Sequence, residues 1–212
     1  MTPVEKQLAP PGGWQPYGAP KIQPFDTRRL SPWMRLAHKV AGKYAERRVG
    51  MAKVPDVFLL LMRNRRLFQP WLRFAARLMP GGTLERQDAE LVILRVGWNC
   101  RSRYEWGQHV IIGQREGLTP QEIARVAQGP DAAGWSPRQS VLLQAADDLH
   151  RDRVIAAATW QRLAEHFTDP QLLEVGMLVG HYEMLAGVLN SVGLALEAPA
   201  EERLAAADIH GG

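Results

Sequence analysis

Cysteine is nearly absent from this chain, since Cys100 is the single cysteine among 212 residues. One thiol cannot form a disulfide within the chain, so no intramolecular dithiol–disulfide cycle can operate. The same scarcity excludes a zinc site built from cysteine pairs and a fold held together by disulfide bonds. Folding must therefore depend on a hydrophobic core, and a hydrophobic content of 46% is enough to build one.

Long apolar runs and a strong charge imbalance are also missing. No apolar run reaches about 18 residues, the length that a membrane-spanning helix requires, so we expect no membrane partner. The first residues lack the apolar segment of a signal peptide, which favours a cytoplasmic location. The net charge is only +4. Basic residues gather between positions 28 and 66, but a solvated helix face explains them better than a nucleic-acid partner.

Strand patterns are missing as well, whereas helix-start and helix-stop residues recur along the chain. Residues 1–30 are rich in Pro and Gly, and we expect them to form an extended or disordered N-terminal arm. Residues 31–212 are expected to form a single all-α domain. One helix is predicted over 31–48, and the next begins at Pro55 and is interrupted at Pro70. The last helix is predicted over 169–197, and the residues expected to cap the intervening helices are Thr83, Ser102, Thr119, Ser136 and Thr159.

Residues able to transfer protons are concentrated between positions 90 and 109. Glu105 and His109 are four residues apart, so they lie on the same face of a helix. Glu90 lies on the apolar stripe of the preceding helix, where partial burial tends to raise the pKa of a carboxyl group. A carboxylate beside an imidazole is suited to proton transfer near neutral pH.

Each of these residues also has a purely structural explanation. Glu90 could pair with a neighbouring arginine, and His109 could pack as a half-buried core side chain. Ser102 and Glu105 have the spacing of a capping box, in which the glutamate reaches back to a backbone donor. The spacing alone does not decide between these roles and catalysis.

Cys100 and His181 are further candidates. Cys100 lies just before the turn into the second of these helices, where a thiol can be reactive, although a small buried hydrophobic side chain is the simpler interpretation. His181 lies on the last helix and could join Glu105 and His109 in a two-histidine, one-carboxylate metal site. Nothing in the spacing requires such a site, so we expect no metal and no cofactor.

Residues 88–110, DAELVILRVGWNCRSRYEWGQHV, resemble the carboxymuconolactone decarboxylase family within the alkylhydroperoxidase-D-like superfamily. The resemblance extends from about residue 55 to residue 197. It includes LVGHYEMLAGVLNSVGLALE, which is similar to the closing helix of the family. The resemblance implies an all-α fold with helices around a small central pocket, assembled as a trimer or hexamer.

The differences from the family pattern bear on function. In the peroxidase branch a glutamate precedes a CxxC pair, and a histidine follows the second cysteine by four residues. Glu90 and His109 match that pattern, but Ser102 and Glu105 stand in place of the two cysteines. The decarboxylase branch lacks the cysteine pair and has a glutamate four residues before the histidine, as this chain does.

We therefore expect a cofactor-free lyase or isomerase that acts on a small carboxylated or carbonyl substrate. His109 would be the main general acid or base, Glu105 would orient it, and Glu90 would be a second proton-handling group. The alternatives are a thiol peroxidase that uses Cys100 and a non-catalytic oligomeric binding protein. The candidate substrate-binding residues are Trp98, Arg101, Tyr104, His181 and Asn190.

Overall fold

The computed structural model describes residues 8–29 and 54–207, together with positions 32, 36, 40 and 209. Helices are the only regular elements in this part of the chain, so the predicted all-α fold is confirmed. Its one β-type contact is an isolated bridge between Gly18 and Leu194. The helix predicted over 31–48 lies outside the described residues, apart from three isolated positions.

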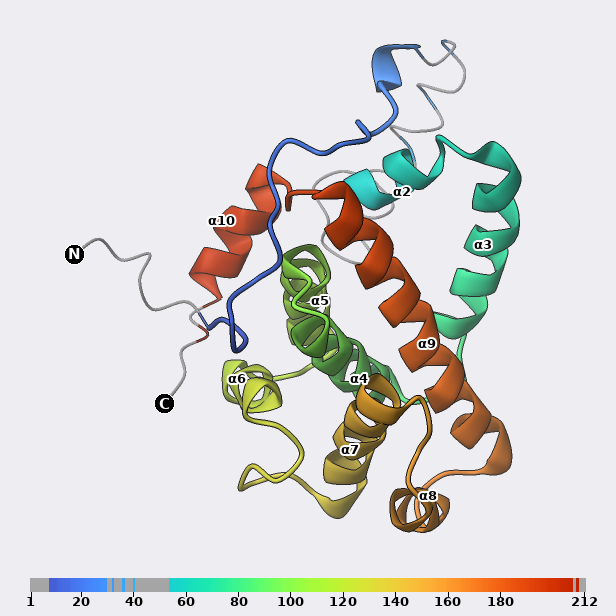
Figure 1. Ribbon diagram of the computed structural model, residues 1–212, viewed down its shortest axis with the longest axis vertical. Helices are drawn as coiled ribbons and strands as arrows, with labels where there is room; N and C mark the ends of the chain where they lie inside the picture. The colour runs from blue at the N-terminus through green and yellow to red at the C-terminus, as the bar shows by residue number, and fades with distance from the viewer. Residues whose placement is uncertain are drawn as a thin grey trace, which may run out of the picture.

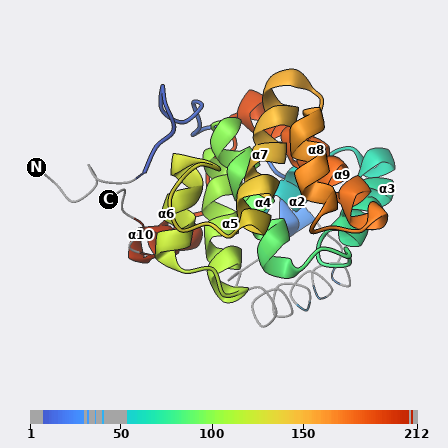
Figure 2. The same cartoon turned by 90° about the horizontal axis from the view of Figure 1, so that it is seen from below.

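The central element of the fold is α4, which packs against α5 on one side and against α7 and α9 on the other (Figures 1 and 2). Ten of its 14 residues are buried, so the helix is enclosed all round. The described helices are η2 (Thr27–Arg29), α2 (Asp56–Leu61), α3 (Arg65–Leu78), α4 (Arg86–Asn99), α5 (Arg103–Arg115), α6 (Pro120–Gln128), α7 (Pro137–Asp152), α8 (Ala157–Ala164), α9 (Asp169–Val192) and α10 (Ala198–Ala206).

Two hydrophobic clusters lie on opposite sides of α4. Leu91 and Leu94 belong to the cluster that α4 shares with α5, α6 and α10. Val92 and Ile93 belong to the second cluster, which α7 and α9 complete. Because burying one such side chain stabilises the fold by about 1.5–3 kcal/mol, these two clusters hold α4 rigidly. A functional group on α4 is therefore fixed from both sides.

Local capping signals were good predictors of two helices. Thr119 and Ser136 each accept a hydrogen bond from a backbone N–H three residues later, and Glu122 and Gln139 complete the two capping boxes. These starts of α6 and α7 are confirmed. Such caps depend only on residues that are neighbours in sequence.

Other predicted boundaries are wrong, and tertiary contacts explain two of them. Thr83 does not cap α4, which begins at Arg86, because its hydroxyl and amide both donate to Glu174 at 2.6 Å. Thr159 lies inside α8 instead of capping it, since its hydroxyl donates to Asp148 at 2.6 Å.

Two further boundary predictions are corrected by local geometry. Pro70 does not interrupt α3, which runs through it. The break comes earlier, where the Asn64 side chain accepts from Leu67 N–H and caps the helix. The last long helix, α9, ends at Val192 and not at position 197, because Gly193 adopts the left-handed conformation. A separate helix, α10, follows.

The extended segment before α2 lies along the body of the protein in Figure 1. Its backbone N–H groups donate to carbonyls on three different elements: Gln15 to Arg101, Lys21 to Val192, and Phe25 to Leu59. The Trp14 ring contacts Trp98 and Trp106 with centroid separations of 5.6 and 5.9 Å. Residues 8–29 are thus joined to the helical body.

By length and composition alone, α9 could cross a membrane, which the sequence analysis did not anticipate. Half of its apolar window is buried inside the protein. It packs against α3, α4 and α7, as a core helix does.

Glu197 joins three helices through one buried carboxylate. It accepts from Asp56 N–H at 2.5 Å, from the Tyr104 hydroxyl at 2.8 Å and from Gln108 Nε2 at 2.5 Å. A Glu197→Ala substitution would leave all three donors without this acceptor, and a lost buried partner costs about 1–3 kcal/mol. We expect a loss of about 3 kcal/mol or more in the free energy of unfolding, measured in urea.

The matched control is the exposed Glu202, whose replacement by alanine should change stability by no more than about 0.5 kcal/mol. Equal stability of the Glu197→Ala and Glu202→Ala proteins would contradict this role for Glu197.

Candidate active site

Gly97 allows α4 and α5 to pack closely beside the candidate site. A Cβ atom on Gly97 of α4 would lie 3.3 Å from Trp106 N and 3.6 Å from Glu105 Cβ. On α5, the position of Gly113 lies opposite Glu90, since a Cβ atom there would be 3.8 Å from Glu90 Cβ. The helices run antiparallel, so this close approach sets which residues of α4 face which residues of α5.

The close packing brings Glu90 and His109 together across the two helices. His109 Nδ1 lies 2.7 Å from Glu90 Oε2. Glu90 is fully buried, and its other oxygen has no hydrogen-bond partner among the described residues. The structure therefore pairs His109 with Glu90, whereas the sequence analysis expected Glu105 to orient it.

Glu105 is the second buried carboxyl group at this place. Both of its oxygens and the Ser102 hydroxyl are buried without a hydrogen-bond partner among the described residues, so the predicted capping box is wrong. Burial raises the pKa of Glu105 to about 8, and the neighbouring Ser102 hydroxyl only partly opposes the rise. At neutral pH this side chain is therefore mostly a neutral acid, able to donate a hydrogen bond or a proton.

Tyr182 of α9 completes the cluster, although it is not among the candidates predicted from the sequence. Its ring meets the His109 ring edge to face, with centroids 5.0 Å apart. Burial raises the pKa of its hydroxyl well above the usual value, and the charges of Glu90 and Glu105 raise it further. The hydroxyl thus stays protonated near both carboxyl groups.

His181 precedes Tyr182 but faces a different group of side chains. Its ring stacks on Trp71 of α3, with an interplanar angle of 14° and centroids 6.0 Å apart. Burial lowers the pKa of His181 to about 4, so the ring is neutral at pH 7. Its Nδ1 is buried without a partner among the described residues.

The remaining candidate binding residues hold parts of the chain together. Arg101 donates to the carbonyls of Gly12 and Gly13 in the extended segment. The Tyr104 hydroxyl donates to Glu197. Asn190 Nδ2 donates to the Cys100 carbonyl at 2.9 Å, and Trp98 packs against two other tryptophans.

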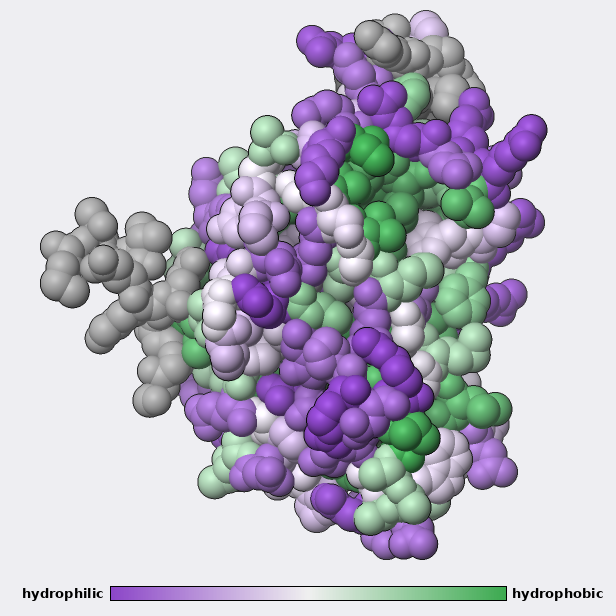
Figure 3. Space-filling view, viewed as in Figure 1, coloured by the Kyte–Doolittle hydropathy of each residue, from purple (hydrophilic) through white to green (hydrophobic). Residues whose placement is uncertain are grey.

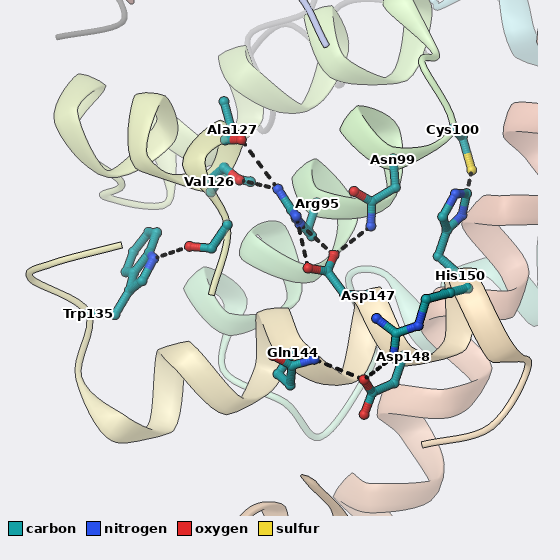
Figure 4. A network of polar contacts seen from close by, with 12 residues as sticks. Arg95, Asn99, Cys100, Val126, Ala127, Trp135, Gln144, Asp147, Asp148 and His150 are labelled. Atoms are coloured by element: carbon teal, nitrogen blue, oxygen red, sulfur yellow. Dashed lines mark hydrogen bonds and ion pairs between the residues drawn. The ribbon is translucent and has the colours of Figure 1, made fainter. Parts of the chain in front are cut away.

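Cys100 lies beside a histidine of α7, as Figure 4 shows. Its Sγ atom is 3.9 Å from His150 Nδ1, which is itself 2.8 Å from Glu183 Oε1. Burial raises the pKa of the Cys100 thiol to about 12, and the charges of Glu105 and Glu183 add to this effect. The thiol is therefore protonated and poorly nucleophilic at neutral pH.

This environment predicts slow alkylation of Cys100. Relative to a free cysteine, whose pKa is about 8.5, a pKa of about 12 lowers the thiolate fraction at pH 7 roughly 3000-fold. We expect iodoacetamide to modify the folded, chelator-treated protein slower than a cysteine peptide by about that factor. Protein unfolded in urea should react at the peptide rate, and a folded protein that reacted as fast as the peptide would contradict the prediction.

One group of side chains in the described part of the chain has an arrangement that could hold a metal ion: Cys100, His150 and Glu183. The metal site of Glu105, His109 and His181 that was considered from the sequence is not among the groups that could hold an ion in this part of the chain. His109 Nδ1 is occupied by Glu90, and the ring of His181 stacks on Trp71.

Comparison with solved structures identifies the class of fold. A peroxidase-related protein from Ralstonia eutropha JMP134, described as an alkylhydroperoxidase AhpD core, superposes with a TM-score of 0.71 at 18% identity over 87% of this chain and 95% of that one. A peroxidase-related protein from Silicibacter sp. TM1040 gives a TM-score of 0.72 at 18% identity over 87% and 96%. The debrominase Bmp8, in complex with 2,3,4-tribromopyrrole, gives 0.72 at 10% identity over 91% and 100%. The all-helical fold is therefore alkylhydroperoxidase-D-like.

Part of the sequence also matches a family model. Residues 65–148 match the carboxymuconolactone decarboxylase family, in agreement with the predicted resemblance. The matched segment contains Glu90, Cys100, Glu105 and His109. No curated protein matches the chain.

Proposed function

We propose that this protein is a cofactor-free lyase or isomerase that transfers protons on a small carboxylated or carbonyl substrate. The observation that carries the proposal is the 2.7 Å contact between His109 Nδ1 and Glu90 Oε2 in a buried setting. A carboxylate on Nδ1 fixes the tautomer and the orientation of the ring. Nε2 is then the nitrogen that exchanges a proton with substrate.

Glu105 supplies the complementary acid. Because the pKa of its buried carboxyl is raised to about 8, Glu105 carries a proton at neutral pH. Glu90 instead contacts the His109 ring. A carboxyl group that keeps its proton at neutral pH is suited to act as the acid in a reaction of this kind. The division of roles differs from that expected from the sequence, where Glu105 oriented the ring.

A decarboxylation shows how these groups would act. When a substrate with a carboxylate β to a carbonyl loses CO₂, the electron pair of the broken C–C bond moves to the carbonyl, forming an enolate. Glu105 donates a hydrogen bond to the enolate oxygen, and the protonated His109 delivers a proton to the carbon. Glu90 holds the imidazolium during this step, and Tyr182 packs on the ring that transfers the proton.

The test is a substrate screen with paired variants. Wild-type protein and the Cys100→Ser variant are incubated with β-keto acids and β-carboxylated lactones, and CO₂ release and product are measured. We expect turnover of at least one compound, with most of the activity retained after the substitution of Cys100. Activity that requires peroxide and disappears in Cys100→Ser would overturn the lyase proposal.

The alternative enzyme is a thiol peroxidase, favoured by the position of Cys100 beside His150 and by the peroxidase-related proteins of similar fold. In that reaction the thiolate would attack the peroxide, form a sulfenic acid and be reduced by an external thiol. The raised pKa of Cys100 opposes it. We therefore rank it second.

We also propose that the protein is a homo-oligomer. Large apolar side chains are exposed along α3 and α9, among them Phe74, Leu173, Met177 and Met184, which are 40–67% exposed. Figure 3 shows hydrophobic surface on the side of the molecule that these helices form. Such patches mark contacts between subunits. Light scattering should give a trimer or hexamer, and a stable monomer at micromolar concentration would contradict this.

A further inference from the structure

Three potential metal ligands converge at the end of α4. Cys100 follows the last residue of α4, His150 lies in the last turn of α7, and Glu183 lies in the middle of α9. Their ligand atoms all lie within 4.8 Å of one another. These residue types come from three different helices, so their convergence does not follow from local sequence.

The hydrogen bonds among the three side chains cannot all be satisfied at once. His150 Nδ1 is 2.8 Å from Glu183 Oε1 and 3.9 Å from Cys100 Sγ. If Nδ1 carries a hydrogen, it donates to the carboxylate and cannot also accept from the thiol. If Nδ1 is the unprotonated nitrogen, it faces the carboxylate with two acceptors opposed. A cation placed among the three atoms would bind all of them.

We propose that Cys100, His150 and Glu183 form a binding site for a divalent transition metal ion of the zinc type. Thiolate, imidazole and carboxylate are all zinc ligands, with bond lengths of about 2.0–2.3 Å. A tetrahedral ion with such bonds separates its ligand atoms by roughly 3.4–3.6 Å. The observed separations of 3.9 and 2.8 Å lie on either side of that range, so small side-chain rotations would complete the site.

The surroundings of the three residues fix them in place. Figure 4 shows Arg95 and Asn99 of α4 bound to Asp147 of α7, at 2.6 Å and 2.7 Å. Asn99 precedes Cys100, and Asp147 lies one turn before His150, so this network sets the distance between the two ligands. The site is preorganised where α4 meets α7.

Two further contacts orient the ligands from outside the site. Arg153 pairs with Glu183 Oε2, which leaves Oε1 for the metal. Asn190 donates to the Cys100 carbonyl and holds the backbone that carries the thiol. Outer contacts of this kind orient metal ligands in proteins. The charges also balance, because a thiolate and a carboxylate neutralise a divalent ion.

The site is open to solvent on the histidine side. The His150 side chain is 37% exposed, whereas that of Glu183 is 15% exposed. An ion can therefore enter, and a water molecule or small ligand can fill the fourth position. None of the three ligands belongs to the Glu90–His109 pair, so this inference stands independently of the proposed function.

Metal titration tests the proposal directly. Untagged, chelator-treated full-length protein is titrated with Zn²⁺ by calorimetry and with Co²⁺ by absorption spectroscopy. We expect one equivalent of each ion to bind per chain, and Co²⁺ to give the thiolate-to-cobalt charge-transfer band in the near ultraviolet. That band reports a bond to sulfur, and Cys100 is the only sulfhydryl in the chain.

The variants separate this site from adventitious binding. Cys100→Ser should abolish the charge-transfer band, and His150→Gln and Glu183→Gln should each weaken Zn²⁺ binding at least 10-fold. Arg153→Ala should weaken it by about 10-fold through the orientation of Glu183. His166→Gln is the matched control and should bind as wild type does. No stoichiometric binding by wild type, or equal Zn²⁺ affinity in wild type and His150→Gln, would overturn the proposal.

Discussion

Replacing His109 by glutamine is expected to lower turnover by about 100-fold or more while the protein remains folded and oligomeric. The glutamine amide can still donate a hydrogen bond to Glu90, so the buried carboxylate keeps a donor. It cannot accept or release a proton at neutral pH, so general acid–base catalysis is lost. The measurement is kcat and KM on a substrate found in the screen, with unfolding in urea measured in parallel.

His166→Gln is the control for this substitution, because His166 lies just after α8 and takes part in the structure through its backbone carbonyl, which accepts from Arg138. It should retain wild-type turnover. Near wild-type turnover of a folded His109→Gln protein would rule out His109 as the acid or base. The contact between Glu90 and His109 would then be a structural pair that joins α4 to α5.

The raised pKa of Glu105 is expected to make the protein less stable as the pH rises, because this carboxyl group keeps its proton more strongly in the folded state than in the unfolded state. The pKa of Glu105 is about 8 in the folded protein and about 4.5 when unfolded, so between these values the native state binds the extra proton. The free energy of unfolding then falls with increasing pH across that window, by up to about 1.4 kcal/mol per unit. Over the whole window the loss is on the order of a few kcal/mol, and it levels off above about pH 8.

The Glu105→Gln variant should lack this contribution, because its amide stays neutral. Unfolding in urea at pH 5, 6, 7, 8 and 9 should show the variant gaining stability relative to wild type as the pH increases. Glu202→Gln, at an exposed position of α10, should follow the wild-type curve. A constant difference between Glu105→Gln and wild type from pH 5 to 9 would show that the Glu105 pKa is not raised.

Features that depend on sequence neighbours were predictable. The capping boxes at Thr119 and Ser136 follow from residues within one helical turn. Ser102 had the same local pattern, yet Glu105 is buried among helices and does not reach back to the cap. Tertiary packing therefore overrode the local signal at Glu105.

The pairing of Glu90 with His109 depended on a register that sequence spacing did not give. Gly97 allows the close approach of α4 to α5, and this approach puts Glu90 opposite His109. Tyr182 was missed because it comes from α9, far along the chain. Its position beside His181, within the segment similar to the family's closing helix, was the available signal.

The neighbours of Cys100 were also beyond prediction from spacing. His150 is 50 positions away and Glu183 a further 33. Their meeting depends on how α7 and α9 pack around α4. The start of α10 had a usable local signal, since Pro199 stands at its first turn, but the last helix was predicted to end at residue 197 with none after it.

The central claim is that the buried cluster transfers protons on carbon, and deuterium incorporation tests it most directly. The reaction is run in D₂O with an active compound from the screen, and the product is examined by NMR. We expect one deuterium, added to a single face of the carbon that lost CO₂, with both wild type and Cys100→Ser, and about 100-fold slower formation of this product with His109→Gln. Deuterium-free product, or incorporation at the same rate in His109→Gln, would contradict the account.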